Sequence, residues 1–178
     1  MSLLNHSYAL IISDAGIKNN VATSIIYIHV CNRPIIKMIY HVTNVTSTEA
    51  ELFAIRCGIN QAVNLPGISK IVVFTDSLHA AKKIFNSAIH LFQLHLAAIS
   101  EELRKFFNTN YNNSIEFWKC PSQCEWPLFK FVDRDTKQLC QTLLLPCKLS
   151  WDFSKKSECD DTIQNWKMTL QASNQKGW

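Results

Sequence analysis

The 178-residue sequence contains only four glycines and five prolines. This shortage excludes a collagen-like, linker-like or low-complexity chain. No apolar run approaches the roughly 20 residues that a membrane-spanning helix needs, so no membrane partner is expected. Charged residues make up 18% of the chain and the formal net charge is +4. So mild a positive charge permits a polyanionic partner without requiring one.

Hydrophobic residues account for 47% of the sequence, enough for the core of one domain. Its seven cysteines are scattered, at positions 31, 57, 120, 124, 140, 147 and 159. A secreted disulfide scaffold normally uses an even number at close spacing. We therefore expect reduced thiols in an intracellular protein, cytoplasmic or nuclear and not secreted. The spacing of four of them, Cys120, Cys124, Cys140 and Cys147, does not match a zinc ribbon. We therefore interpret them as thiols that bind no metal.

Hydrophobic periodicity predicts nine elements in the first 145 residues. Short β-branched runs predict strands at 8–13, 21–30, 35–42, 70–75 and 114–119. Helical spacing of apolar residues predicts helices at 47–63, from 77 to about 86, at 89–107 and at 128–143. Ser47 or Thr48 is the expected N-cap of the first of these helices. The order β-β-β-α-β-α-α-β-α predicts an α/β fold with a five-stranded mixed sheet. Its first three strands are antiparallel, and helical crossovers make the first, fourth and fifth parallel.

The composition changes after residue 145. We expect 1–145 to form the main domain and 146–178 to form a C-terminal extension with one further helix, at about 158–172. The sequence does not indicate an oligomeric state.

Four acidic residues stand apart because each follows or faces an apolar run. Asp14 and Asp76 end predicted strands, Glu51 lies in the first turn of the helix at 47–63, and Asp133 lies early in the helix at 128–143. Neighbouring strand ends and a helix packed across them can bring such side chains together. Clustered carboxylates repel one another unless a cation neutralises them, and Mg²⁺ or Mn²⁺ prefers such oxygen ligands. Two ions about 4 Å apart promote in-line displacement at a phosphodiester.

Each acid also has a simpler explanation. An aspartate at a strand end is often a turn former, and Asp76 could cap the following helix. Glu51 could interact only with the helix dipole. Asp133 could pair with Arg134 or Lys137. The hypothesis of a cluster therefore depends on the order of the acids and their flanking residues taken together.

Those flanking residues resemble the ribonuclease H family. The resemblance covers roughly 8–141 and is carried by four blocks: IISDAG at 11–16, TSTEAELFAI at 46–55, VFTDS at 73–77, and the segment 118–137. It is greatest to the ribonuclease H domains of non-LTR retrotransposon polyproteins, particularly fungal ones, which follow a reverse transcriptase. In these the first block contains Thr-Asp-Gly-Ser, the first helix Ala-Glu-Leu, and the fourth strand ends in Thr-Asp-Ser.

The resemblance implies a ribonuclease H-like fold and a metal-dependent endonuclease that hydrolyses the RNA strand of RNA–DNA hybrids. Asp14, Glu51 and Asp76 match the acids of the family that bind metal, and spacing from Pro121-Ser122 places Asp133 at the fourth. Two Mg²⁺ (or Mn²⁺) ions are implied. The implied partners are the hybrid itself and a reverse transcriptase domain of the same polyprotein.

Substrate contacts are expected from residues beside the acids and from nearby basic residues. The candidates are Gly16, Ser77, Ser122, Lys82 and Lys83, with Arg104 and Lys105 as weaker additions. No helix carries the dense basic protrusion found in some members of the family, so affinity for duplex could come from a linked domain.

Some positions depart from the family pattern. Ala15 replaces a glycine, and Gln123 replaces a loop histidine linked to product release or water activation, which predicts slower turnover. Asp135 is a rival to Asp133, although the two would face about 200° apart on a helix. The alternative function is a catalytically decayed ribonuclease H-like domain that acts as a nucleic-acid or protein docking module. An integrase is less favoured, because it would need glutamate at Asp133.

Overall fold

The computed structural model describes residues 7–18, 20–85, 94–121 and 126–139. Within these ranges the strands are β1 (Ser7–Lys18), β2 (Val21–Val30), β3 (Ile36–Thr43), β4 (Ile68–Thr75) and β5 (Ser114–Lys119). The helices are α1 (Ser47–Val63), α2 (Leu78–Phe85), α3 (Leu94–Thr109) and α4 (Pro127–Leu139). This order confirms the predicted β-β-β-α-β-α-α-β-α arrangement. The helix predicted at 158–172, like the whole extension 146–178, lies outside the described residues.

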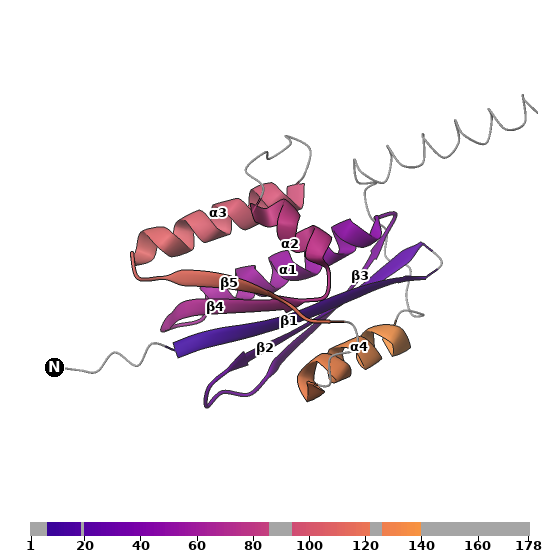
Figure 1. Cartoon of the computed structure of the whole chain (residues 1–178), viewed down its shortest axis with the longest axis horizontal. Helices are drawn as coiled ribbons and strands as arrows, with labels where there is room; N and C mark the ends of the chain where they lie inside the picture. The colour runs from indigo at the N-terminus through magenta and orange to yellow at the C-terminus, as the bar shows by residue number, and fades with distance from the viewer. Residues whose placement is uncertain (1–6, 19, 86–93, 122–125, 140–178) are drawn as a thin grey trace, which may run out of the picture.

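The strands form one mixed sheet in the order β3-β2-β1-β4-β5. The β1–β2 and β2–β3 pairs are antiparallel, whereas β1–β4 and β4–β5 are parallel. Figure 1 shows α1, α2 and α3 over one face of the sheet and α4 over the other. The predicted fold class is therefore confirmed. In the described part of the chain, no helix is long and apolar enough to cross a bilayer.

Each face of the sheet has its own hydrophobic core. Ile11 packs into the larger core beneath α1 and α3, and its neighbour Ile12 packs into the smaller core beneath α4. Both are fully buried, because successive side chains of a strand point to opposite faces. A strand covered on both faces has a continuous apolar sequence rather than an alternating one. The central strands are thereby held rigidly between two layers.

β1 continues beyond the predicted end at residue 13, so the prediction that Asp14 ends the strand is wrong. Parallel pairing with β4 stops at Ile12 opposite Phe74, but antiparallel pairing with β2 continues to Lys18 opposite Val21. The apolar run in the sequence ends where pairing with β4 ends, and pairing with β2 keeps the backbone extended beyond that point. Asp14 therefore lies within β1, just past its last pair with β4.

The start of α1 also differs from the prediction, which placed its N-cap at Ser47 or Thr48. Thr46 is the N-cap: its hydroxyl accepts from the Glu49 N–H at 3.3 Å, and Glu49 accepts from the Thr46 N–H at 2.9 Å. This reciprocal capping box satisfies two N–H groups that no helical bond can reach. Glu49 thus occupies the first turn of α1, and Glu51 lies two residues further along, so the prediction that Glu51 lies in the first turn is wrong.

Gly58 on α1 provides a test of the packing between this helix and the sheet. An added Cβ would lie 2.6 Å from Cγ2 of Ile11 and 3.2 Å from Cγ2 of Ile26. Both isoleucines are fully buried and stiff at χ1, so the methyl groups cannot easily move. We expect Gly58→Ala to lower the free energy of unfolding by about 1–2 kcal/mol despite better helix propensity. Chemical denaturation measures this change.

The control for Gly58→Ala is Asn60→Ala, an exposed position on the same helix. It gains the same kind of helix propensity without a clash, so it should be neutral or slightly stabilising. A Gly58→Ala variant that is more stable than wild type would contradict the close packing of α1 on the sheet.

Candidate metal centre

Three acidic side chains converge at one end of the sheet. A carboxylate oxygen from each of Asp14, Glu51 and Asp76 lies within 4.8 Å of the other two. Asp14 projects from β1 just past its pairing with β4, Asp76 follows the last residue of β4, and Glu51 comes from α1. The structure therefore brings together three of the four acids expected to bind metal.

Glu51 is the most enclosed member of the cluster. Its Oε1 accepts a hydrogen bond from the backbone N–H of Ala15 at 3.2 Å. Its Oε2 is buried and has no hydrogen-bond partner among the described residues. Leaving a buried charged oxygen unpaired costs more than the roughly 1–3 kcal/mol of a neutral group. A cation at this point would satisfy Oε2, so the geometry fits a metal ligand.

Electrostatics at the cluster disfavour three free carboxylates. Burial, with the charges of Asp76 and Asp133 adding to it, raises the pKa of Asp14 to about 6. Burial and the charges of Asp14 and Asp76 raise the pKa of Glu51 well above its usual value. Burial and the charge of Asp133 also raise the pKa of Asp76. Hard divalent cations such as Mg²⁺ and Mn²⁺ prefer oxygen ligands, which the three carboxylates supply, and a bound cation would remove the repulsion.

Asp133 lies outside the group of three acids but is electrostatically coupled to it. Its charge raises the pKa of both Asp14 and Asp76. Its Oδ2 accepts from Lys137 Nζ at 2.7 Å, the simpler pairing considered from the sequence. Asp135, two residues on, instead accepts from the Tyr27 hydroxyl at 2.7 Å and from Lys37. Of the two rivals, Asp133 faces the cluster, and its role as fourth ligand stays a prediction.

The helix after Asp76 is capped by its neighbour. Ser77 Oγ accepts from the Ala80 N–H at 3.3 Å, and the Ser77 N–H donates to Thr75 Oγ1 at 3.1 Å. Ser77 therefore performs the capping that the simpler explanation gave to Asp76, and the Asp76 carboxylate joins the cluster instead. The expected substrate contact Gly16 lies in β1 opposite Thr23. Ser122 and Gln123 lie outside the described residues.

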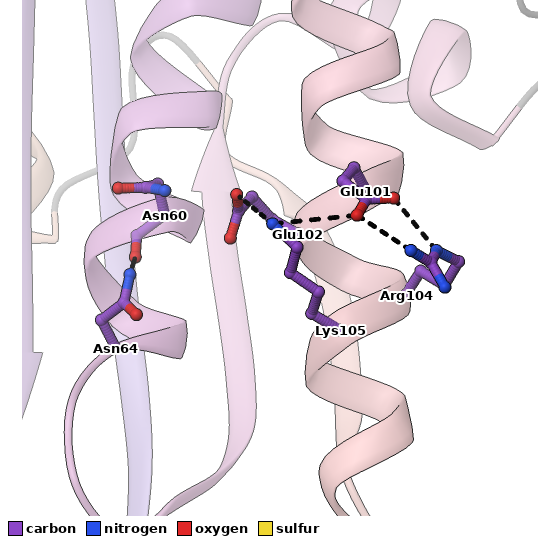
Figure 2. Close-up of polar contacts among 6 residues, drawn as sticks. All are labelled: Asn60, Asn64, Glu101, Glu102, Arg104 and Lys105. Atoms are coloured by element: carbon purple, nitrogen blue, oxygen red, sulfur yellow. Dashed lines mark hydrogen bonds and ion pairs between the residues drawn. The ribbon is translucent and has the colours of Figure 1, made fainter.

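The basic candidates differ in how they are paired. Arg104 binds Glu101 through two hydrogen bonds of 2.9 and 3.0 Å, and Lys105 lies 3.5 Å from Glu102. Figure 2 shows these ion pairs on α3, with the Asn64 amide donating to the Asn60 carbonyl on α1 nearby. Acids beside them partly neutralise Arg104 and Lys105, which makes them weaker phosphate ligands. Lys82 and Lys83 lie on α2, where Lys82 is exposed.

Sequence reasoning missed two residues that act on the cluster. Thr136 hydrogen-bonds to Asp14 and lowers its pKa. It lies three residues after Asp133, on the same face of a helix, so the spacing contained the signal. Lys119 lowers the pKa of Asp76. It is the residue of β5 paired with Thr75, so parallel register could have placed it beside Asp76.

The fold and the acid cluster together define a ribonuclease H-like domain. The model of a protein family described as reverse transcriptase-like matches residues 26–120, more than half of the chain. The chain therefore belongs to this reverse transcriptase-like, ribonuclease H-like family. The matched segment contains Glu51 and Asp76, whereas Asp14 and Asp133 lie outside it. No curated protein sequence shows a significant match to the chain.

Solved ribonuclease H structures share the fold. The N-terminal RNase H domain of a Mycobacterium tuberculosis protein, solved as a fusion with maltose-binding protein, gives a TM-score of 0.59 at 15% identity and covers 75% of this chain and 95% of that one. RNase H1 from the halophilic archaeon Halobacterium salinarum gives 0.50 at 14% identity and covers 65% and 86%. At these identities the similarity establishes the fold alone.

The raised pKa of Asp14 predicts a pH dependence of stability. The pKa of Asp14 is higher in the folded than in the unfolded protein, so protonation of Asp14 stabilises the fold. This stabilisation is fully present below about pH 4 and is lost as pH rises through about 6. Without divalent metal, Asp14 alone should therefore reduce the free energy of unfolding by about 3 kcal/mol between pH 4 and pH 8. Asp14→Asn should remove this loss, so the variant gains on wild type as pH rises. Urea denaturation across this range measures the difference.

The control for Asp14→Asn is Glu116→Gln. Glu116 is ion-paired with Lys70 on the surface, which lowers its pKa, so its replacement should cause at most a small loss at high pH. If the free energies of unfolding of Asp14→Asn and wild type differ by the same amount from pH 4 to pH 8, the pKa of Asp14 is not raised in the folded protein.

Proposed function

We propose that this chain is a divalent-metal-dependent endonuclease that hydrolyses the RNA strand of RNA–DNA hybrids. The observation that carries the proposal is the cluster of buried Asp14, buried Glu51 and half-buried Asp76, with Glu51 Oε2 unpartnered among the described residues. The needs of folding do not account for such a cluster, because uncompensated acids held this close together are destabilising. The likeness to solved RNase H domains supports the fold on which this chemistry would operate.

The residues of the chain would hold and orient the ions. Two bound Mg²⁺ or Mn²⁺ ions would supply charge stabilisation to the attacking and leaving oxygens of a phosphodiester. Ala15 fixes Glu51 Oε1 through its N–H, and Thr136 restrains Asp14. Asp133 would be the fourth ligand. To bind the ion, its carboxylate would give up its ion pair with Lys137.

The proposed substrate contacts surround this site. Lys82 and Lys83 would contact phosphates from α2, the helix that follows Asp76. Gly16, Ser77 and Ser122 would contact the strand beside the acids. RNA in an A-form-like hybrid presents 2′-hydroxyls across a shallow minor groove, which favours recognition by shape rather than base sequence.

The wider context is also part of the proposal. We place the nuclease domain at 1–145 and an extension at 146–178, in an intracellular polyprotein of a retroelement with a reverse transcriptase domain as partner. The family description supports this association.

A decayed ribonuclease H-like domain that docks nucleic acid or protein is the second candidate function. The ion pair between Asp133 and Lys137 favours it, because a committed fourth metal ligand would not need a lysine partner. The substitution of Ala15 for the glycine of the family pattern favours it as well.

Replacement of Asp76 tests the activity directly. A labelled RNA–DNA hybrid incubated with wild type and Mg²⁺ or Mn²⁺ should be cut in its RNA strand. Asp76→Asn should slow cleavage by a factor on the order of 100 or more, because it removes a direct ligand. Glu102→Gln, on α3 and away from the cluster, is the control and should retain activity. Wild type as inert as Asp76→Asn would exclude the enzyme and favour the docking module.

A pair of variants on α4 distinguishes the two candidates for the fourth acid. We expect Asp133→Asn to weaken Mn²⁺ binding and slow cleavage by about 10-fold or more. Asp135→Asn should leave both unchanged but lower stability, because it breaks contacts with Tyr27 and Lys37. Calorimetric titration with Mn²⁺ and the same cleavage assay measure these effects. Loss of metal binding in Asp135→Asn alone would reverse the assignment.

A further inference from the structure

A groove of about 520 Å³ lies between α2 and β5. Its lining is largely apolar and consists of Leu78, Ala81, Lys82, Phe85, Phe117 and Lys119. The Phe85 ring meets the Phe117 ring edge-on, with centroids 5.1 Å apart and planes at 80°. This pair of rings gives the groove an aromatic wall.

The apolar side of α2 is only partly used by the core. Ala80 is the buried residue of this helix, while Phe85 remains 65% exposed and Leu78 43% exposed. Exposed apolar side chains scattered singly need no explanation, but these line one concave surface. Such a surface is suited to a flat apolar group from a ligand.

The charge of the groove defines the rest of that ligand. Lys82 and Lys119 are both exposed and neither forms an ion pair with another residue in the described part of the chain, although Lys119 lies near Asp76. No acidic residue is among the six that line the groove. Two lysines beside an aromatic wall match a nucleotide, which combines phosphates with a flat base. This complementarity favours nucleic acid over a purely apolar partner.

The groove adjoins the acid cluster. Lys119 pairs with Thr75 across the β4–β5 ladder, and Asp76 is the next residue. α2 begins two residues after Asp76, with Leu78, the first residue of the groove. A nucleic-acid strand with one phosphate at the acid cluster can therefore place its neighbouring nucleotides over α2 and β5.

We propose that this groove binds the unpaired nucleotides of a single-stranded extension of the RNA–DNA hybrid. The bases would lie against Phe85, and the phosphates would contact Lys82 and Lys119. This inference rests on the proposed function, since it concerns the same substrate. In a paired duplex the faces of the bases are stacked inside and cannot reach an aromatic wall. The groove therefore distinguishes a hybrid with a single-stranded extension from a blunt one.

The experiment compares two labelled hybrids with the same paired region, one blunt and one with a single-stranded extension. Affinity of the full chain is measured by fluorescence anisotropy in EDTA, so that neither hybrid is cut. Wild type should bind the extended hybrid more tightly. Phe85→Ala should reduce this preference roughly 10-fold and leave blunt binding unchanged, since stacking on one base contributes about that much. Phe85 is mostly exposed, so the variant should fold.

Charge variants provide an independent test. Lys82→Gln and Lys119→Gln should each weaken binding of the extended hybrid and lower its salt-dependence slope by about 0.7, the value for one contact with a single strand. The matched controls are Tyr111→Ala, an aromatic residue that is 92% exposed outside the groove, and Lys70→Gln on β4, where the lysine is ion-paired with Glu116. Both controls should match wild type.

The outcomes separate this inference from the proposed function. Cleavage of the blunt hybrid in Mg²⁺ is measured in parallel. An active enzyme that binds both hybrids equally would overturn the groove proposal alone. A preference that depends on Phe85, in a chain that cuts neither hybrid, would support the groove and overturn the nuclease. A dimer that Phe85→Ala dissociates in sedimentation experiments would assign the groove to a second copy of the chain and overturn the proposal.

Discussion

Repulsion among three closely packed carboxylates, two of them buried and one half-buried, is the constraint on which the rest of this structure depends. One carboxylate oxygen from each of Asp14, Glu51 and Asp76 lies within 4.8 Å of the other two, and the elements that hold these residues cannot easily move apart. A flexible scaffold would relax by separating the charges. Here β1 and β4 are buried between two hydrophobic layers, so repulsion instead appears as raised pKa values and as an unpartnered oxygen on Glu51.

The scaffold that resists this repulsion is built from ordinary packing. Ile11 and Ile12 anchor β1 on opposite faces of the sheet, and Gly58 lets α1 approach closely enough for Glu51 to reach the backbone N–H of Ala15. Apolar burial contributes roughly 25 cal/mol per Å² and is not directional, so it can offset a local penalty elsewhere in the domain. The cluster is therefore a place where stability is lost and chemical capacity is gained.

The sequence predicted the element order and the sheet, because both depend on local pattern, and it predicted the three acids from their order and their flanking residues. It did not predict interactions that depend on a partner distant along the chain. Asp14 was placed at a strand end because the apolar run stops there, whereas pairing with β2 extends the strand to Lys18. Thr46 was missed because three adjacent hydroxyl residues compete for one cap. Spacing alone favoured Asp133 over Asp135, but the contacts of Asp135 with Tyr27 and Lys37 depend on how α4 packs on the sheet and could not be predicted.

One feature of register connects the acids with the groove. Parallel pairing of β1 with β4 stops at Phe74, so Asp14 and Asp76 both emerge where the sheet opens. The pairing of β4 with β5 extends one step further, to Thr75 and Lys119, which sets a lysine beside the acids. α2 then begins with Leu78, on the side of that lysine. A negative site and a positive, aromatic groove thus adjoin because the two neighbours of β4 end at different residues.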